Sequence, residues 1–235
     1  MRDCGEASRF KRALVVAAHP DDAEFGCGGT VALWSRDGWQ FHYLILTDGS
    51  KGSEDPEMTA TRLAAIRQEE QQSAASVLGV KEVVFLDFVD GELIYGPDVM
   101  REVVRHIRRV KPYAVFSSDP NQIVHNNFIN HPDHRAAGMI SLDAVYPIAR
   151  NRPSFPELLG DGLEPHSARE VYLWSADAPN FQVDVTEVAE LKFQALMQHR
   201  SQFAEIDAQV ADWRERWSEE NGEYVERFRR VELRF

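Results

Sequence analysis

The sequence has little cysteine. Only Cys4 and Cys27 occur among its 235 residues, which is too few for a disulfide framework, and the CxxC spacing of many zinc sites is missing. A metal ion in this protein must therefore be held by histidine and carboxylate side chains. We expect Cys27 to be a small buried residue.

Long apolar runs and an excess of positive charge are also missing. No stretch approaches the ~20 apolar residues that a membrane helix needs, and the N-terminal segment lacks the apolar core of a signal peptide. We therefore expect a soluble, cytoplasmic protein without membrane insertion. The formal net charge of -12 argues against a nucleic-acid-binding surface, which depends on clustered Lys and Arg. A small neutral or cationic ligand is the expected partner.

Apolar segments rich in β-branched residues alternate with helical patterns along the chain. The expected strands cover residues 12–19, 41–47, 81–88, 113–119 and 169–176, and the expected helices cover 28–37, 57–78, 97–110, 133–144 and 186–199. This alternation predicts an α/β fold, a Rossmann-like three-layer sandwich in which helices cover both faces of a mostly parallel sheet. We expect residues 1–11 to form a tail and residues 12–235 to form a single domain.

A first polar cluster, AHPDDAEFGCGG, follows the strand expected at 12–19. It places His19, Asp21 and Asp22 at the carboxyl end of that strand, where ligands bind in sheets of this kind. The glycines at 26, 28 and 29 are expected to turn the chain sharply into the next helix. The segment is not a dinucleotide-binding fingerprint, because the third glycine is missing from the required position and the carboxylates would repel a pyrophosphate.

A second polar cluster, HPDHRAAG, follows the strand expected at 113–119. Pro132 suits the first position of a helix, which would put His131 near the N-cap and Asp133 and His134 in the first turn. Both clusters then face the same edge of the sheet.

Two strand ends would thus bring His19, Asp22 and His134 toward one point. Two imidazoles and one carboxylate, with an open position for water, are typical of catalytic zinc. The spacing also allows a different division, in which His131 is the ligand. A simpler alternative is that each His-Pro-Asp forms a turn in which the Asp caps a helix and the His is a polar surface group.

The motifs resemble those of a known family. In chain order, AHPDDAEFGCGGT, LTDGSKGS, IRQEE followed by LGV, HPDHRAAG and HRSQ are similar to the successive motifs of the LmbE-like deacetylases, also called the PIG-L family. The resemblance covers residues 12–205, with a weaker echo in EYVERF at 223–228. Members of the family remove the acetyl group from N-acetylglucosamine units carried on inositol, malate, phosphatidylinositol, chitobiose or antibiotic scaffolds.

Carried onto this chain, the resemblance implies a Zn2+ ion, or alternatively Fe2+, bound by His19, Asp22 and His134. Asp21 would then be the general base that takes a proton from the activated water. His131 would stand opposite Asp21, either as the partner of the oxyanion or as the acid that protonates the departing amine.

Supporting roles follow from the same resemblance. Asp133 would hold the tautomer of His131, or alternatively cap the helix. Arg67 resembles the sugar-binding arginine of the family, since its planar guanidinium suits paired hydroxyls, and Glu70 would steady it from the same helix.

The loop at 120–130 offers further candidate contacts. Asn126 and Asn127 are candidates for contacts with substrate hydroxyls, although Asn-rich turns are common. Ile129 stands where relatives of the mycothiol pathway have a tyrosine that stabilises the transition state. Another group must therefore supply that hydrogen bond, or the chemistry depends more heavily on the metal and His131.

The expected function is that of a metal-dependent hydrolase. It would remove an N-acetyl group from an N-acetylglucosamine-containing small molecule or glycoconjugate by attack of a metal-activated water. One alternative is an amidase that acts on a larger, mycothiol-type thiol conjugate. Another is a catalytically silent metal-binding α/β module, which would have no need of Asp21. Relatives range from monomers to hexamers, so a homo-oligomer such as a trimer or hexamer fits the family.

Overall fold

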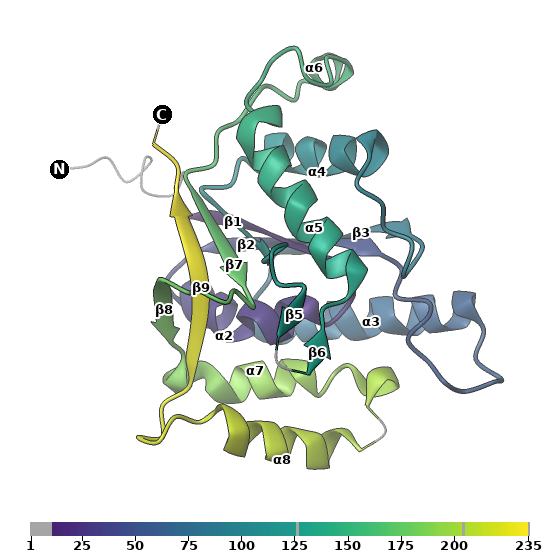
Figure 1. Ribbon diagram of the computed structural model, residues 1–235, viewed down its shortest axis with the longest axis vertical. Coiled ribbons are helices and arrows are strands. Elements are labelled where there is room, and N and C mark those ends of the chain that lie inside the picture. The colour runs from purple at the N-terminus through teal and green to yellow at the C-terminus, as the bar shows by residue number, and fades with distance from the viewer. Residues whose placement is uncertain (1–10, 126, 204, 235) are drawn as a thin grey trace.

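The fold is built around a seven-stranded sheet with the spatial order β3-β2-β1-β4-β7-β9-β8 (Figure 1). The computed structural model describes residues 11–125, 127–203 and 205–234. The strands of the sheet are β1 (Arg12–Ala17), β2 (Gln40–Thr47), β3 (Glu82–Phe88), β4 (Ala114–Ser118), β7 (Glu170–Trp174), β8 (Phe181–Asp184) and β9 (Val225–Glu232). The strands β3, β2, β1, β4 and β7 run parallel, and β9 is antiparallel to both β7 and β8.

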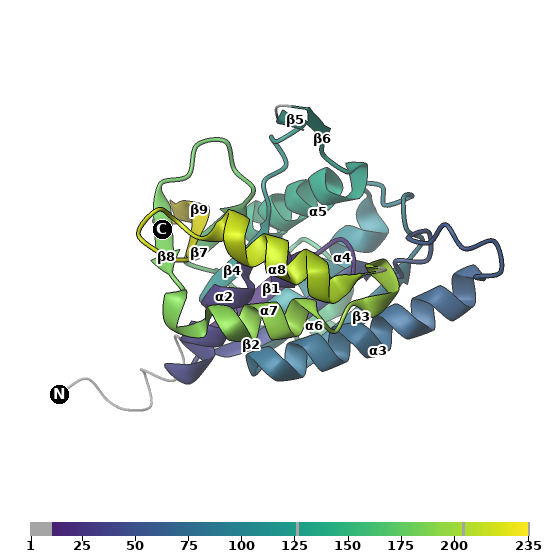
Figure 2. The ribbon, with the colours of Figure 1, turned by 90° about the horizontal axis from the view of Figure 1, so that it is seen from below.

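Helices cover both faces of this sheet (Figures 1 and 2). One face carries α2 (Asp22–Arg36), α3 (Ala60–Leu78) and α7 (Ala189–Leu196), and the other carries α4 (Pro97–Val110) and α5 (Pro132–Asp143). The helix α8 (Ile206–Trp217) packs on the outer side of α7. The shorter segments are the helix α6 (Glu157–Gly160), the helical turns Ala144–Ile148, Thr186–Val188 and Arg200–Gln202, and the hairpin strands β5 (Val124–His125) and β6 (Phe128–Ile129). This arrangement confirms the expected three-layer α/β fold.

The central strand β1 shows why the layers form. Val15 and Ala17 point into the apolar layer beneath α2 and α3, whereas Leu14 and Val16 point into the layer beneath α4 and α5. All four side chains are buried, as expected for a parallel strand covered on both faces. The apolar run therefore drives the strand into the middle of the molecule, and the polar cluster that follows must lie at its carboxyl end.

The expected elements are found up to α7, but several of their ends differ. A helical segment that begins at Asp22 precedes the expected start at residue 28, and non-helical dihedral angles at Cys27 separate the two parts of α2. The antiparallel strands β8 and β9 and the helix α8 were not predicted. No helix among the described residues is long and apolar enough to cross a membrane.

The glycines at 26, 28 and 29 do not form the turn that follows β1, but they lie around a break in α2, where Cys27 has non-helical dihedral angles. A Cβ atom at Gly26 would lie 2.5 Å from the ring of Trp174, and one at Gly29 would lie 2.7 Å from Val185. These two glycines therefore allow close packing of the helix. The turn is made instead by Asp21, which has a φ of 100° and so occupies a conformation that is strained for a residue with a Cβ.

Candidate metal centre and catalytic pocket

The two polar clusters meet where the order of the strands reverses. The chain leaves β1 toward α2 on one face of the sheet and leaves neighbouring β4 toward α5 on the other, which opens a crevice between the two connections. A cavity of about 860 Å³ lies there, and both polar clusters line it. This volume is typical of small-ligand pockets. The structure thus brings together the residues that the sequence singled out at separate strand ends.

Three potential metal ligands face one another in this cavity. Nδ1 of His19 lies 3.2 Å from Nε2 of His134 and 3.7 Å from Oδ2 of Asp22. Nε2 of His134 lies 3.0 Å from Oδ1 of Asp22. Bonds of about 2.0–2.1 Å to one tetrahedral ion place neighbouring ligand atoms about 3.3 Å apart, so these separations suit a shared divalent cation.

The outer nitrogens of both imidazoles already have partners. Nε2 of His19 lies 3.1 Å from Asp90 and 3.2 Å from Asp133, and because ionised carboxylates can only accept hydrogen bonds, Nε2 must be the donor. Nδ1 of His134 lies 2.9 Å from Oδ1 of Asn130. In the neutral tautomers that satisfy these contacts, the lone pairs of His19 and His134 point at each other. A cation between them removes this repulsion, so the residues fit a metal ion with oriented ligands.

The charges around the ligands also favour a cation. Burial opposes a charge on His19, but its hydrogen bonds to Asp133 and Asp90 outweigh that cost and raise the pKa of its imidazole to about 10. Burial likewise opposes a charge on Asp22, yet the neighbouring His134 and His19 hold the pKa of its carboxyl well below the usual range. Without a metal, the imidazole of His19 is thus protonated, and this proton supplies the positive charge of the site.

Asp21 is held beside the ligands in its strained conformation. Its backbone N–H donates to Oε1 of Gln71 at 2.8 Å, and its Oδ2 accepts from Nη2 of Arg67 at 3.3 Å. Burial raises the pKa of the Asp21 carboxyl to about 6, although the charge of Arg67 acts in the opposite direction. The side chain is therefore ionised at neutral pH and has a basicity suited to accepting a proton.

His131 caps α5, as the sequence predicted. Its Nδ1 accepts a hydrogen bond from the backbone N–H of Asp133 at 3.2 Å. Burial and the nearby His19 lower the pKa of its imidazole, so the neutral form is favoured. Because Nδ1 is the acceptor, the proton of the neutral ring lies on Nε2 and is available to a ligand. One ring nitrogen of His131 also lies within 4.8 Å of those of His19 and His134, so the set allows a second division of ligands.

Asp133 does not hold the ring of His131, contrary to the expectation. Its carboxylate contacts Nε2 of His19 and accepts the backbone N–H groups of Gly91 at 2.7 Å and Leu93 at 3.3 Å. The side chain lies at the start of α5, from which it reaches across to the loop after β3. It therefore orients a ligand that belongs to the other polar cluster.

Arg67 lines the cavity, and its Nη1 and Nη2 have partners, whereas its buried Nε has no hydrogen-bond partner among the described residues. The guanidinium donates to the carbonyl oxygens of Gly49 at 3.0 Å and Pro20 at 2.6 Å, besides its contact with Asp21. Glu70 does not steady it, contrary to the expectation, because the Glu70 carboxylate binds the backbone and hydroxyl of Ser201. Arg67 thus fixes the turn that presents Asp21. The expected contact of Arg67 with sugar hydroxyls stays a prediction.

The hairpin formed by β5 and β6 supplies a different set of residues from the one expected. Asn127 is exposed at its turn, whereas Phe128 and Asn130 line the cavity. Asn126 lies outside the described residues. The expected contact of Asn127 with substrate stays a prediction.

Sequence reasoning missed several buried residues that support the site. Asp90 follows β3 as His19 follows β1, and a polar residue at that third strand end was the available signal. Glu24 and Gln71 were missed as well, and they form a buried polar chain with His199, which belongs to the HRSQ motif. Gln71 Nε2 donates to Glu24 at 2.9 Å, and Nε2 of His199 lies 3.3 Å from the other oxygen of Glu24. No pattern in the sequence pairs these residues, since they come from three different helical segments.

Comparisons with known proteins agree with this site. The family model PIG-L, described as GlcNAc-PI de-N-acetylase, matches residues 14–145, which include both His-Pro-Asp clusters. Diacetylchitobiose deacetylase of Thermococcus kodakarensis is 39% identical over 195 residues, which are 83% of this chain and 71% of that protein.

Two solved structures are similar over almost the whole chain. N,N'-diacetylchitobiose deacetylase from Pyrococcus horikoshii has a TM-score of 0.84 and 32% identity, and the match covers 94% of this chain and 84% of that chain. GalB, the 4-carboxy-2-hydroxymuconate hydratase from Pseudomonas putida KT2440, has a TM-score of 0.78 and 25% identity over 96% and 98% of the two chains. Because the family model covers more than half of the chain and the Thermococcus kodakarensis relative is 39% identical, the chain belongs to the PIG-L family.

Proposed function

We propose that this protein is a metal-dependent N-deacetylase that releases acetate from an N-acetylglucosamine-containing small molecule or glycoconjugate. The observation that carries the proposal is the approach of Nδ1 of His19 to Nε2 of His134 at 3.2 Å, with the carboxylate of Asp22 3.0 Å from His134 and the ionised Asp21 beside them. The names of the related deacetylases support the amino-sugar substrate. They favour it over a mycothiol-type thiol conjugate.

The proposed metal ligands are His19, Asp22 and His134, and Zn2+ is the preferred ion, with Fe2+ as the alternative. A divalent cation at such a site supplies Lewis acidity, which lowers the pKa of water and polarises an amide carbonyl. Asp90 and Asp133 hold the imidazole of His19 in the orientation that binding requires.

Each residue around the metal would have its own role in amide hydrolysis. Asp21 accepts a proton from the attacking water, and its strained backbone aims the carboxylate into the cavity. His131 donates a hydrogen bond from Nε2 to the carbonyl oxygen as that oxygen becomes negative. The proton held by Asp21 then passes to the amide nitrogen as the C–N bond breaks, giving acetate and a free amino group on the sugar. Arg67 holds the carboxylate of Asp21 in position through the hydrogen bond from its Nη2.

Replacing Asp21 by Asn tests the proposal, because the amide retains the shape of the side chain and cannot act as a base. We expect metal content equal to that of the wild type and acetate release reduced by about 100-fold or more. His134→Ala is the contrasting variant, which should lose the metal itself. A near-normal rate for Asp21→Asn, or full wild-type activity after removal of the metal, would overturn the mechanism. Assays with a thiol conjugate beside N-acetylglucosamine separate the two substrate classes.

The cytoplasmic location, the single domain and the trimer or hexamer stay predictions from the sequence.

A further inference from the structure

The peptide group between Pro20 and Asp21 is held at both ends by one helix. Its carbonyl oxygen accepts a hydrogen bond from Nη2 of Arg67 at 2.6 Å, and its N–H donates to Oε1 of Gln71 at 2.8 Å. Arg67 and Gln71 both belong to α3, and because they are four residues apart, they lie on the same face of that helix. We call these two contacts the peptide clamp. They fix the plane of the peptide group that leads into Asp21.

The plane of this peptide group determines the strained conformation of Asp21. The φ of Asp21 is 100°, and a half-turn of the peptide plane would carry it into the negative range that residues with a Cβ prefer. That half-turn would break both contacts and point the N–H at the guanidinium of Arg67. The peptide clamp therefore opposes relaxation of the turn.

Glu24 determines which way the amide of Gln71 faces. Nε2 of Gln71 donates to Oε1 of Glu24 at 2.9 Å, and a carboxylate has only acceptors, so the amide oxygen is left for the N–H of Asp21. The other carboxylate oxygen of Glu24 lies 3.3 Å from Nε2 of His199. The side chains of Glu24, Gln71 and His199 are all fully buried. The amide of Gln71 thus has one orientation in which both of its ends have partners.

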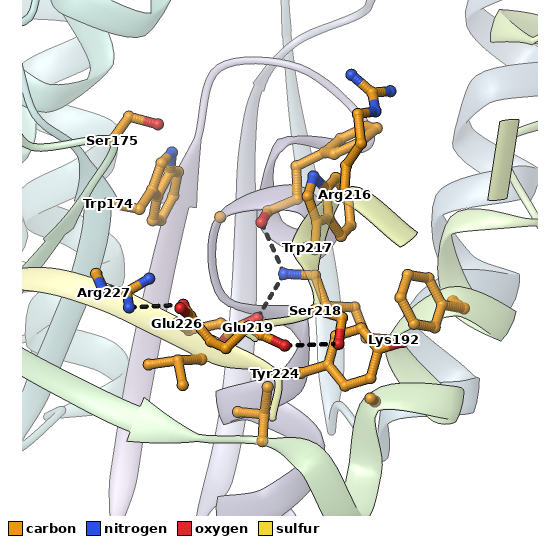
Figure 3. Close-up of a pocket in the computed structure, with 16 residues that line it drawn as sticks. Trp174, Ser175, Lys192, Arg216, Trp217, Ser218, Glu219, Tyr224, Glu226 and Arg227 are labelled. Carbon is orange, nitrogen blue, oxygen red and sulfur yellow. Dashed lines mark hydrogen bonds and ion pairs between the residues drawn. The ribbon is translucent and has the colours of Figure 1, made fainter. Parts of the chain in front are cut away.

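The rest of α2 is supported by a different buried carboxylate. After the break in the helix, Glu226 of β9 accepts the N–H groups of Gly29 at 2.8 Å and Thr30 at 2.7 Å. Glu226 is paired with Lys192 at 2.6 Å in the wall of a second cavity, of about 400 Å³, between α2, α7 and β9 (Figure 3). Glu226 therefore supports the part of α2 after the break, whereas Glu24 acts on the turn before it.

We propose that Gln71 is a positioning residue for the base Asp21, and that Glu24 fixes the direction in which the Gln71 amide acts. This inference rests on the proposed function, because it concerns the base of that reaction. While the amide oxygen holds the N–H of Asp21, the turn keeps the Asp21 carboxylate in the wall of the catalytic cavity. When the amide is removed, the N–H loses its partner and the turn relaxes to a negative φ, which displaces the carboxylate.

Gln71→Met tests the proposal, because it removes the amide and keeps an unbranched side chain. We expect kcat for acetate release from the β-linked disaccharide of N-acetylglucosamine to fall by about tenfold, with KM within about twofold of the wild type. The Kd for Zn2+ should change by less than about twofold, because Asp22 is held separately by the N–H groups of Ala18 and His19. In a crystal structure of the variant, the φ of Asp21 should be negative.

The exchange variant Gln71→Glu/Glu24→Gln tests the direction of the contacts. It returns an acceptor to the N–H of Asp21 and keeps one carboxylate and one amide in the chain, so kcat should recover to within about threefold of the wild type. Glu226→Gln is the matched control, because it also replaces a buried carboxylate that supports α2, and its kcat should stay within about twofold of the wild type. If Glu226→Gln does not fold, Glu70→Gln on α3 is the control, since that carboxylate contacts Ser201.

The possible results separate the two proposals. No acetate from the wild type would overturn the proposed function, and the φ of Asp21 in the Gln71→Met crystal would still test the peptide clamp. If the wild type releases acetate, a kcat for Gln71→Met within about twofold of it would overturn the role of Gln71 alone.

Two other results would also overturn that role. An exchange variant as slow as Gln71→Met would show that the acceptor for Asp21 is not what matters. A loss of Zn2+ binding that parallels the loss of rate would show that Gln71 supports the metal ligands rather than the base. If Gln71→Met does not fold, Gln71→Asn takes its place, because its amide is one methylene too short to reach Asp21.

Discussion

Replacing Asp133 by Asn removes one of the two carboxylate charges that hold the outer nitrogen of His19. The Asp133 and Asp90 oxygens lie 3.2 and 3.1 Å from that nitrogen, so each carries a similar share of the contact. Loss of a partner of this kind typically weakens metal binding by about 10–100-fold. In the Asp133→Asn variant, the neutral amide would favour the His19 tautomer with a proton on Nε2 less strongly, and only that tautomer leaves Nδ1 free to bind the metal.

The structure favours the upper end of that range. The Asp133 carboxylate also accepts the N–H groups of Gly91 and Leu93 and so fixes the loop that presents Asp90. Substitution therefore disturbs both partners of His19 at once. We expect the Kd for Zn2+ to rise by about 100-fold, which corresponds to about 2.7 kcal/mol.

Competition between the protein and a chelating dye for Zn2+ at pH 7 measures this change. Asp143→Asn is the matched control, because Asp143 lies at the other end of α5 and its carboxylate contacts the hydroxyl of Tyr95 at 2.8 Å. The control should bind Zn2+ as the wild type does. A Kd for Asp133→Asn within about twofold of the control would refute the reasoning, since the second carboxylate would then suffice.

Two further predictions concern stability. Glu226→Gln leaves the Lys192 ammonium buried and unpaired and should lower the free energy of unfolding by about 3–5 kcal/mol in urea titrations. Glu190→Gln, which breaks an exposed pair with Arg214, should lower the free energy of unfolding by less than about 1 kcal/mol. Equal losses of stability in the two variants would contradict the view that the Lys192–Glu226 pair is the buried one. Burial lowers the pKa of His106, so the folded state favours the neutral ring, and stability is lost as the pH falls below about 6.5. His106→Gln should reduce the drop in unfolding free energy between pH 7.5 and 5.5, and an unchanged drop would count against the prediction.

The convergence of the two polar clusters was predictable because a parallel sheet places its carboxyl ends along one edge. Strand patterns located β1 and β4, and the polar residues that follow them could only lie at that edge. The residues that we propose as metal ligands were therefore accessible from the sequence. The direction of each carboxylate was not accessible, because Asp133 and Glu70 contact residues that are distant in sequence, and spacing along one helix does not reveal such partners.

The C-terminal part was harder to predict for a physical reason. The strand β9 is rich in charged residues and pairs with the short edge strand β8, so its apolar signal is weak. Its Glu226 nevertheless accepts the backbone N–H groups of Gly29 at 2.8 Å and Thr30 at 2.7 Å. These groups lack helical partners because α2 restarts after the break at Cys27. The motif EYVERF thus supplies Glu226 as the hydrogen-bond acceptor for a helix start that lies about 200 residues earlier in the chain.

The two His-Pro-Asp clusters share a sequence, but their aspartates make different contacts. In the first, the backbone turn at Asp21 leaves Asp22 to accept the N–H groups of Ala18 and His19, which points its other oxygen toward His134. In the second, Asp133 turns back to the imidazole of His19. Each cluster therefore orients a proposed ligand that the other supplies, so the proposed set is complete only when β1 and β4 are paired. A metal ion bound by this set would then stabilise the folded sheet as well as the site, because an unfolded chain does not hold the two clusters together.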